Sequence, residues 1–115
     1  MANINGDAGD NTLQDGVGDD ILNGKGGNDV IIVTGGADKA YGDTGNDVIN
    51  AAFDDGAHDT LLGGDGDDVI LGAQGDQLYG EAGFDAFTLN MATSTTALHL
   101  EIGNLTSGGA LHLDD

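Results

Sequence analysis

The chain of 115 residues has no cysteine, proline or tryptophan, and only 4% of its residues are aromatic. Without cysteine it can form neither disulfide bonds nor thiolate metal sites. It has two basic residues, Lys25 and Lys39, against 21 acidic ones. The basic surface that nucleic acids and anionic membranes require is therefore missing. No apolar run reaches the ~18 residues of a membrane span. We expect no binding to nucleic acid and no membrane span.

Glycine and acidic residues dominate instead, with 22 glycines and a net charge of −19. A chain of this composition buries little apolar surface to offset the entropy lost on ordering its backbone. Composition alone would place it near the disordered proteins. The length allows one domain. A compact fold requires that the carboxylates be neutralised, and divalent cations are the obvious candidates.

A nine-residue period runs from residue 6 to residue 88. Its clearest copy is residues 63–71, GGDGDDVIL, in which six turn-forming residues precede three apolar ones. The sixth position holds Asp, or Asn in the first copy, and successive sixth positions are 9, 9, 9, 9, 12, 9, 8 and 9 residues apart. Two positions later an apolar residue follows, large in every copy except at Ala40. A flexible linker would not keep this phase.

The period predicts an all-β fold, a parallel β-roll. A three-residue strand cannot bury a face alone, so the copies must stack. With two copies per turn, parallel strands satisfy each other's backbone groups between turns. We expect a right-handed solenoid with two strands per turn over residues 6–88. Its inward residues form two ladders, one of Leu13, Ile31, Ile49, Ile70 and Phe87, and one of Leu22, Ala40, Leu61 and Leu78.

The two ends differ from the repeats. Residues 1–5 are expected to be an N-terminal tail. After residue 88 glycine becomes less frequent, and residues 97–102 and 110–113 alternate apolar and polar side chains as half-buried strands do. Because a solenoid needs its ends covered, we expect residues 89–115 to form a C-terminal β cap.

The six-residue turns have the composition of a calcium-binding loop. Ca²⁺ takes six to eight oxygen ligands from carboxylates and backbone carbonyls. Glycine allows loop carbonyls to point inward, and the short Asp side chain keeps its carboxylate near the turn. An EF-hand is excluded because no bidentate Glu stands at the twelfth loop position. No Gly-Lys-Ser/Thr phosphate loop and no nucleophilic dyad are visible, so the chain is not expected to be an enzyme.

The pattern G-G-x-G-x-D-x-U-x, with U large and apolar, resembles that of the RTX (repeats-in-toxin) family. Residues 63–71 match it at every fixed position, and residues 24–32 and 42–50 match it closely. The resemblance implies calcium between successive turns, with about seven ions in all. The implied sixth-position ligands are Asn11, Asp20, Asp29, Asp38, Asp47, Asp59, Asp68, Asp76 and Asp85. The implied carbonyl ligands are Gly24, Gly26, Asn28, Gly42, Thr44, Asn46, Gly63, Asp65 and Asp67.

The loops that keep the pattern best, 24–29, 42–47 and 63–68, are expected to bind most tightly. Loop 33–38 is degenerate, because Val33 and Thr34 replace its leading glycines, and the neutral Asn11 predicts a weaker first site.

The resemblance implies a calcium-binding module of a larger secreted bacterial protein. Such a module is disordered without calcium and folds outside the cell, aiding secretion of its parent polypeptide by a type I route. Parents in the family include proteases, lipases and alginate epimerases. The alternative is an accessory module that binds a polysaccharide or a surface ligand.

Overall fold

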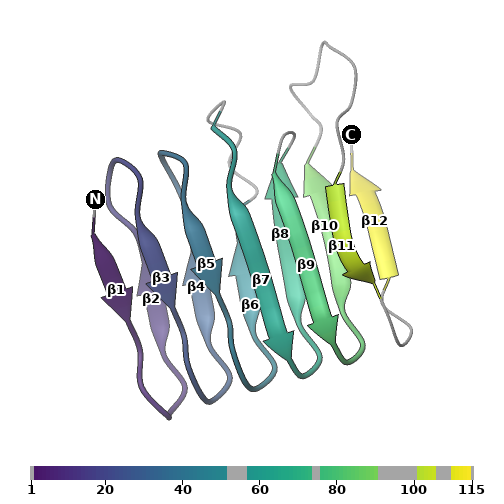
Figure 1. Cartoon of the computed structure of the whole chain (residues 1–115), viewed down its shortest axis with the longest axis horizontal. Helices are drawn as coiled ribbons and strands as arrows, with labels where there is room; N and C mark the ends of the chain where they lie inside the picture. The colour runs from purple at the N-terminus through teal and green to yellow at the C-terminus, as the bar shows by residue number, and fades with distance from the viewer. Residues whose placement is uncertain (1, 52–56, 74–75, 91–100, 106–109, 115) are drawn as a thin grey trace.

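Short parallel strands form two stacked sheets in the computed structural model, which describes residues 2–51, 57–73, 76–90, 101–105 and 110–114. The chain alternates between the sheets, so that two strands complete one coil (Figure 1). The sheet nearer the viewer, here the front sheet, has the order β1 (Asn3–Asn5), β3 (Ile21–Asn23), β5 (Lys39–Tyr41), β7 (Thr60–Asp65), β9 (Gln77–Ala82) and β11 (Glu101–Leu105). The back sheet has the order β2 (Thr12–Gln14), β4 (Val30–Ile32), β6 (Val48–Asn50), β8 (Val69–Ala73), β10 (Ala86–Asn90) and β12 (Ala110–Asp114).

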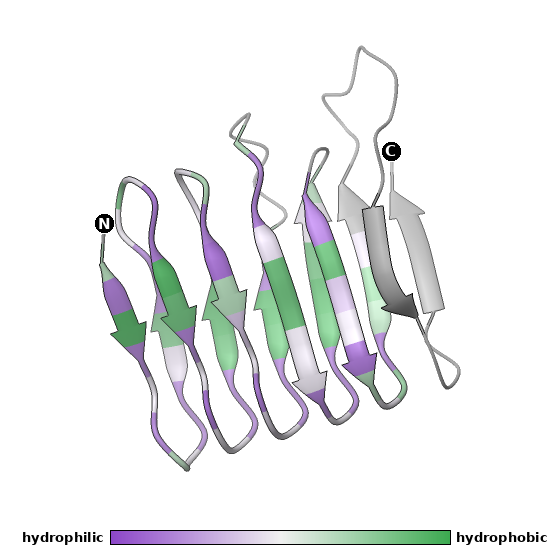
Figure 2. Cartoon of the chain, viewed as in Figure 1, coloured by the Kyte–Doolittle hydropathy of each residue, from purple (hydrophilic) through white to green (hydrophobic). Residues whose placement is uncertain are grey.

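The strand register confirms the predicted parallel β-solenoid. Ile31 pairs with Leu13 on one side and Ile49 on the other, and Ala40 lies between Leu22 and Leu61 in the same way. Both ladders point inward, and their members are fully buried except Leu13, which is 8% exposed. In Figure 2 the strands are hydrophobic at their centres and the loops at both edges are mostly hydrophilic.

The core between the two sheets is thin. Beyond the two ladders, the core cluster of the described residues contains Val33 and Ala51, with Ile4 packed partly against it. Each turn of about eighteen residues therefore contributes about two core side chains, which leaves little hydrophobic stabilisation for each ordered residue. The fold must draw stability from elsewhere.

The irregular repeats do not disturb the register. The three-residue insertion before residue 54 places Lys39 opposite Thr60, and the eight-residue copy at 72–79 places Thr60 opposite Gln77. Both changes lie between strands, in segments that include residues 52–56 and 74–75, which are outside the described residues. The strand pairing therefore continues unchanged on both sides of each irregularity.

At the two ends the structure adds strands to the solenoid. Within the expected tail 1–5, β1 pairs in parallel with β3. At the C-terminal end β11 pairs with β9 and β12 with β10, both in parallel. These strands extend the two sheets, so the expected separate cap is not shown. Residues 97–100 of the expected strand lie outside the described residues. Within the described chain, no helix is long and apolar enough to span a membrane.

Candidate metal centre

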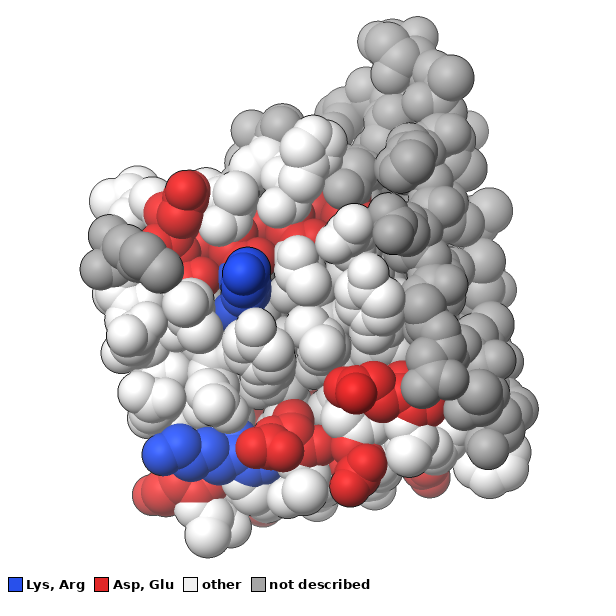
Figure 3. Space-filling model, in the orientation of Figure 1, with Lys and Arg blue, Asp and Glu red and all other residues white. Residues whose placement is uncertain are grey.

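The sixth-position aspartates are buried at the points where the loops enter the strands. The loops that follow front-sheet strands form the lower edge of the molecule, and those that follow back-sheet strands form the upper edge (Figure 1). Figure 3 shows acidic side chains gathered in two bands near these edges. The sixth-position carboxylates are at most 3% exposed: Asp20, Asp29, Asp38, Asp47, Asp59, Asp68, Asp76 and Asp85.

One oxygen of each of these carboxylates belongs to a hydrogen-bond ladder along the solenoid. The backbone N–H of Asp29 donates to Oδ1 of Asp47 at 2.8 Å, and the N–H of Asp47 donates to Oδ1 of Asp68 at 2.8 Å. The same bond recurs on the upper edge, from the N–H of Asp20 to Oδ1 of Asp38 at 2.6 Å. Oδ1 thus fixes the direction of each carboxylate by joining it to the preceding turn.

The second oxygen has no such partner at four of these residues. Oδ2 of Asp29, Asp38, Asp47 and Asp68 is buried and accepts no hydrogen bond. A buried carboxylate oxygen without a partner carries a large desolvation cost. Either a proton or a cation must compensate for it.

On the lower edge, first-position glycines border the Oδ2 atoms of Asp29, Asp47 and Asp68 closely. A Cβ atom built on Gly42 would lie 2.6 Å from Oδ2 of Asp47 and 2.5 Å from the carbonyl oxygen of Gly63. A Cβ on Gly24 would likewise meet Oδ2 of Asp29 at 2.5 Å and the carbonyl oxygen of Gly42 at 3.0 Å. A carboxylate oxygen and a carbonyl oxygen therefore border the same space. This mixed set of hard oxygens is the kind that Ca²⁺ prefers.

Burial makes the charged form of these carboxylates costly. It raises the pKa of Asp38 and of Asp47 to about 6 and that of Asp68 to about 7. The pKa values of Asp29 and Asp85 are also raised, chiefly by burial. The backbone hydrogen bonds lower these pKa values, and neighbouring acidic residues raise them further. A cation at the free oxygens would reverse the balance and keep the carboxylates ionised.

Asn11 differs from the sixth-position aspartates in the bond that its side-chain oxygen accepts. Its side-chain oxygen accepts the N–H of Asp7 in its own loop, at 2.8 Å, while its own N–H donates to Oδ1 of Asp29 at 2.7 Å. It is only half-buried. The first lower-edge loop thus lacks the carboxylate that the later loops present.

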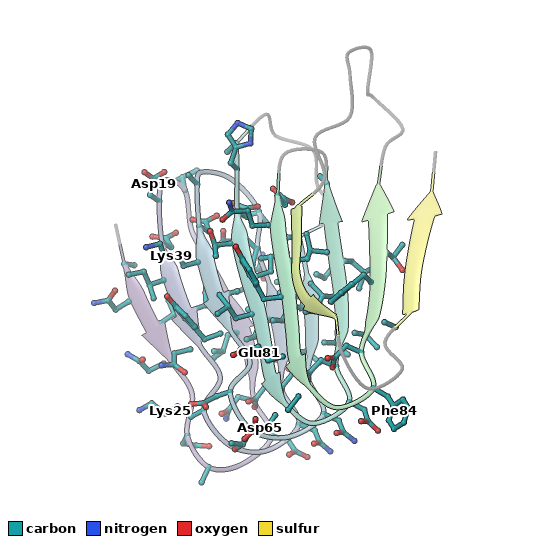
Figure 4. The ribbon with its side chains drawn as sticks, turned by 45° about the vertical axis from the view of Figure 1, so that its right-hand side comes forward. Asp19, Lys25, Lys39, Asp65, Glu81 and Phe84 are labelled. Carbon is teal, nitrogen blue, oxygen red and sulfur yellow. The ribbon has the colours of Figure 1, made fainter. Side chains whose placement is uncertain are left out.

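Most of the predicted carbonyl ligands stand in the lower-edge loops, whereas Gly63 and Asp65 lie at the C-terminal end of β7. Their role as ligands stays a prediction. The side chains of Asn28, Asn46 and Asp67 are exposed and accept backbone N–H groups from the following turn, at 2.8–2.9 Å. The carbonyl oxygen of Asp65 accepts the N–H of Gly45 at 3.0 Å. The outer rim of each loop is therefore ordered by bonds that leave the sixth-position Oδ2 atoms untouched. Figure 4 labels Asp65 on this edge.

Sequence reasoning missed Asp15. Its carboxylate lies with those of Asp20 and Asp38, and the ligand oxygens of the three are within 4.8 Å of one another. All three side chains are buried. Asp15 occupies a first position, where the pattern has glycine. The acidic residue at this position was the sequence signal that could have identified Asp15 as a candidate ligand.

A stacked roll with buried, partly unpaired carboxylates at both edges is a metal-binding β-solenoid. The family model of the RTX calcium-binding nonapeptide repeat (4 copies) matches residues 3–31, 24–57 and 53–87. The chain therefore belongs to the RTX calcium-binding repeat family, whose repeat is a structural calcium-binding element rather than a catalytic one. No curated protein matches the chain.

Proposed function

We propose that this chain is the calcium-dependent folding module of a larger secreted bacterial protein. It is disordered where calcium is scarce and folds once exported, which aids the secretion and folding of its parent. The observation that carries this proposal is the set of buried Oδ2 atoms without hydrogen-bond partners, at Asp29, Asp38, Asp47 and Asp68.

The coupling of folding to calcium follows from the weakness of the core. With about two buried apolar side chains per turn, the solenoid cannot offset both its conformational entropy and the burial of ionised carboxylates. When binding sites exist only in the folded state, metal binding free energy becomes folding free energy. An ion present at 100 times its Kd adds about 2.7 kcal/mol per site. Several ions together convert an unstable chain into a stable one.

Each group in the loop has a separate task in holding calcium. The sixth-position aspartates supply carboxylate oxygens, which the Oδ1 ladder keeps in place. The first-position glycines leave the space that a Cβ would fill. Bound calcium supplies the positive charge that the buried oxygens lack. The sixth-position carboxylates of successive turns would hold the ion, and its charge would offset the repulsion between them.

A calcium titration followed by circular dichroism tests this function. We expect a disordered spectrum in chelator and a cooperative gain of β-structure, half-complete at a free calcium of about 0.1–1 mM, the affinity range of extracellular modules. Mg²⁺ should not replace calcium, since it requires a stricter octahedral geometry. Half-complete folding below about 1 µM calcium would mean that the chain folds inside a cell, and would contradict a secretion-coupled role.

A groove on the front sheet favours a second function, binding of a neutral polysaccharide. Its volume is about 240 Å³, and its lining residues include Tyr41, Leu62 and Asn23. Oδ1 of Asn23 is buried and has no hydrogen-bond partner. An aromatic surface beside amide and carboxylate groups suits a sugar ring and its hydroxyls. Asp43, Asp65 and Glu81 also line the groove and disfavour an anionic polysaccharide.

Glycan-array binding of the calcium-loaded chain tests this second function. Tyr41→Ala should abolish binding to any neutral glycan that the wild-type chain retains. Tyr79→Ala is the control, because Tyr79 lies on the same sheet but outside the groove lining. No glycan bound by the wild-type chain, or equal loss in both variants, would contradict a role for the groove.

A further inference from the structure

Asp15 gives one upper-edge loop a feature that the other described loops lack. At the first position, the described copies have Gly6, Gly24, Gly42, Gly63, Gly72 and Gly80, and Val33 in the degenerate copy. Asp15 places a third carboxylate beside the two sixth-position carboxylates of Asp20 and Asp38. It is 9% exposed, so the additional charge is held inside the molecule rather than in solvent.

Thr34 orients this additional carboxylate. Its hydroxyl donates to Oδ1 of Asp15 at 2.6 Å, and its backbone N–H donates to Oδ2 at 2.8 Å. Thr34 stands in the degenerate loop 33–38, where a glycine would supply the N–H but no hydroxyl. Val33 beside it is fully buried in the core. Val33 and Thr34, which replace the two leading glycines of the pattern, therefore each have a structural role.

Among the described residues, five of the six carboxylate oxygens in the cluster accept one hydrogen bond each and keep a lone pair for an ion, and the sixth accepts none. Oδ1 of Asp20 accepts the N–H of Ala2 at 2.7 Å, and its Oδ2 accepts the N–H of Gly16 at 3.1 Å. Oδ1 of Asp38 accepts the N–H of Asp20. Oδ2 of Asp38 is buried without a partner, and the Asp38 residue is 0% exposed. Three converging carboxylates with one unsatisfied buried oxygen need a positive charge nearby, and a cation held by all three supplies it.

We propose that Asp15, Asp20 and Asp38 together hold one cation, with Asp15 as a ligand and Thr34 as its positioning residue. This inference rests on the proposed calcium-binding function. The third carboxylate makes this the tightest site of the chain, because the attraction for a cation grows with the charge of the ligand set. It also makes this site the one that most favours a trivalent lanthanide over Ca²⁺, since three carboxylates neutralise three positive charges.

Chelator-competition titrations with Ca²⁺ and Tb³⁺ test the site. For the wild-type chain we expect a first ion that binds at least about tenfold more tightly than the rest, and a Tb³⁺ preference concentrated in that ion. Asp15→Asn keeps the shape but removes the charge. It should abolish the tight first step and its Tb³⁺ preference while the remaining ions bind as before.

Asp10→Asn is the matched control, because it removes the same charge from an exposed Asp. Oδ1 of Asp10 accepts the N–H of Asn28 at 2.7 Å, and Asn28 makes the equivalent bond with its own amide oxygen in the next turn. An Asn is therefore native-like at this position, and the first step should be unchanged. Loss of the first step in Asp10→Asn as well would assign the effect to net charge and overturn the proposal.

Thr34 variants decide the case even if Asp15→Asn fails to fold. Thr34→Val removes the hydroxyl donor and should weaken the first step, whereas Thr34→Ser should restore it. A first step that is unchanged in Thr34→Val, or in a folded Asp15→Asn, would overturn the three-carboxylate site and leave the calcium module intact. A wild-type chain that binds no Ca²⁺ at all would instead contradict the proposed function itself.

Discussion

The substitution Asp68→Asn is expected to act in opposite directions on the metal-free and the calcium-loaded chain. Asp68 is 1% exposed, its Oδ1 accepts the N–H of Asp47 at 2.8 Å, and its Oδ2 has no partner. Asparagine has the same shape, and its amide oxygen can accept this bond in place of Oδ1. It removes the charge that burial makes costly and that calcium needs.

The magnitude follows from the pKa of Asp68. Burial raises this pKa from 3.8 to about 7, and each pKa unit corresponds to 1.36 kcal/mol, so ionised Asp68 costs the metal-free fold about 4 kcal/mol at pH 8. Asn avoids this cost and should stabilise the metal-free fold by up to that amount. In the presence of calcium the same variant lacks a carboxylate ligand, so it should need more calcium to fold.

Two titrations followed by circular dichroism measure the two effects. In chelator, an osmolyte such as trimethylamine oxide drives folding, and Asp68→Asn should need less of it than the wild-type chain. In calcium, the folding midpoint of Asp68→Asn should move to higher concentration. Asp10→Asn, with an exposed carboxylate, should change neither midpoint appreciably. An Asp68→Asn variant that folds at the same or lower calcium concentration would refute the assignment of Asp68 as a ligand. If Asp68→Asn needed more osmolyte than the wild-type chain to fold in chelator, the buried charge of Asp68 would not destabilise the metal-free fold.

Three further predictions concern the core, the loop backbone and pH. Ile49→Ala should lower the free energy of unfolding of the calcium-loaded chain by about 2–5 kcal/mol in urea, because Ile49 is fully buried, whereas Val30→Ala at a 38% exposed site should change it little. Gly45→Ala should raise the calcium midpoint more than Gly18→Ala: both have positive φ, at 110° and 97°, but a Cβ on Gly45 would clash with the carbonyl of Gly27 while one on Gly18 meets nothing within 4 Å. In chelator, β-structure should be greater at pH 4 than at pH 8, because carboxylates such as Asp47 and Asp68 have raised pKa values in the fold. The folded state then binds more protons than the unfolded state, so stability falls as pH rises from about 4 to about 7. A pH-independent spectrum would contradict this.

The sequence predicted the solenoid because its signal repeats. An apolar residue two positions after each sixth-position Asp or Asn, large in every copy except at Ala40, keeps its phase through the insertion before residue 54 and the short copy at 72–79. That phase determines which side chains face inward, and both ladders are buried as predicted. It also determines that the sixth-position aspartates lie above one another, as the Oδ1 ladder shows.

The repeat pattern did not predict the strands at the two ends of the solenoid or the cluster of Asp15, Asp20 and Asp38. Alternation with period two predicts a strand but does not distinguish a capping strand from another turn of the solenoid, and β11 and β12 extend the sheets. In the expected tail, Ile4 pairs with Leu22. A single apolar residue was too weak a sequence signal to predict this strand. Asp15 and Thr34 looked like departures from a pattern. Their bonds join residues 19 positions apart, which only the stacking of turns brings together.

Small-angle X-ray scattering of one sample, first with calcium and then with excess chelator, measures whether the compact fold depends on bound cations. We expect a radius of gyration near 12.9 Å with calcium and about 34 Å after chelation, the value for an unfolded chain of this length. Re-addition of calcium should restore the compact value. A chelated sample that keeps the compact radius would contradict the claim that bound cations stabilise these turns.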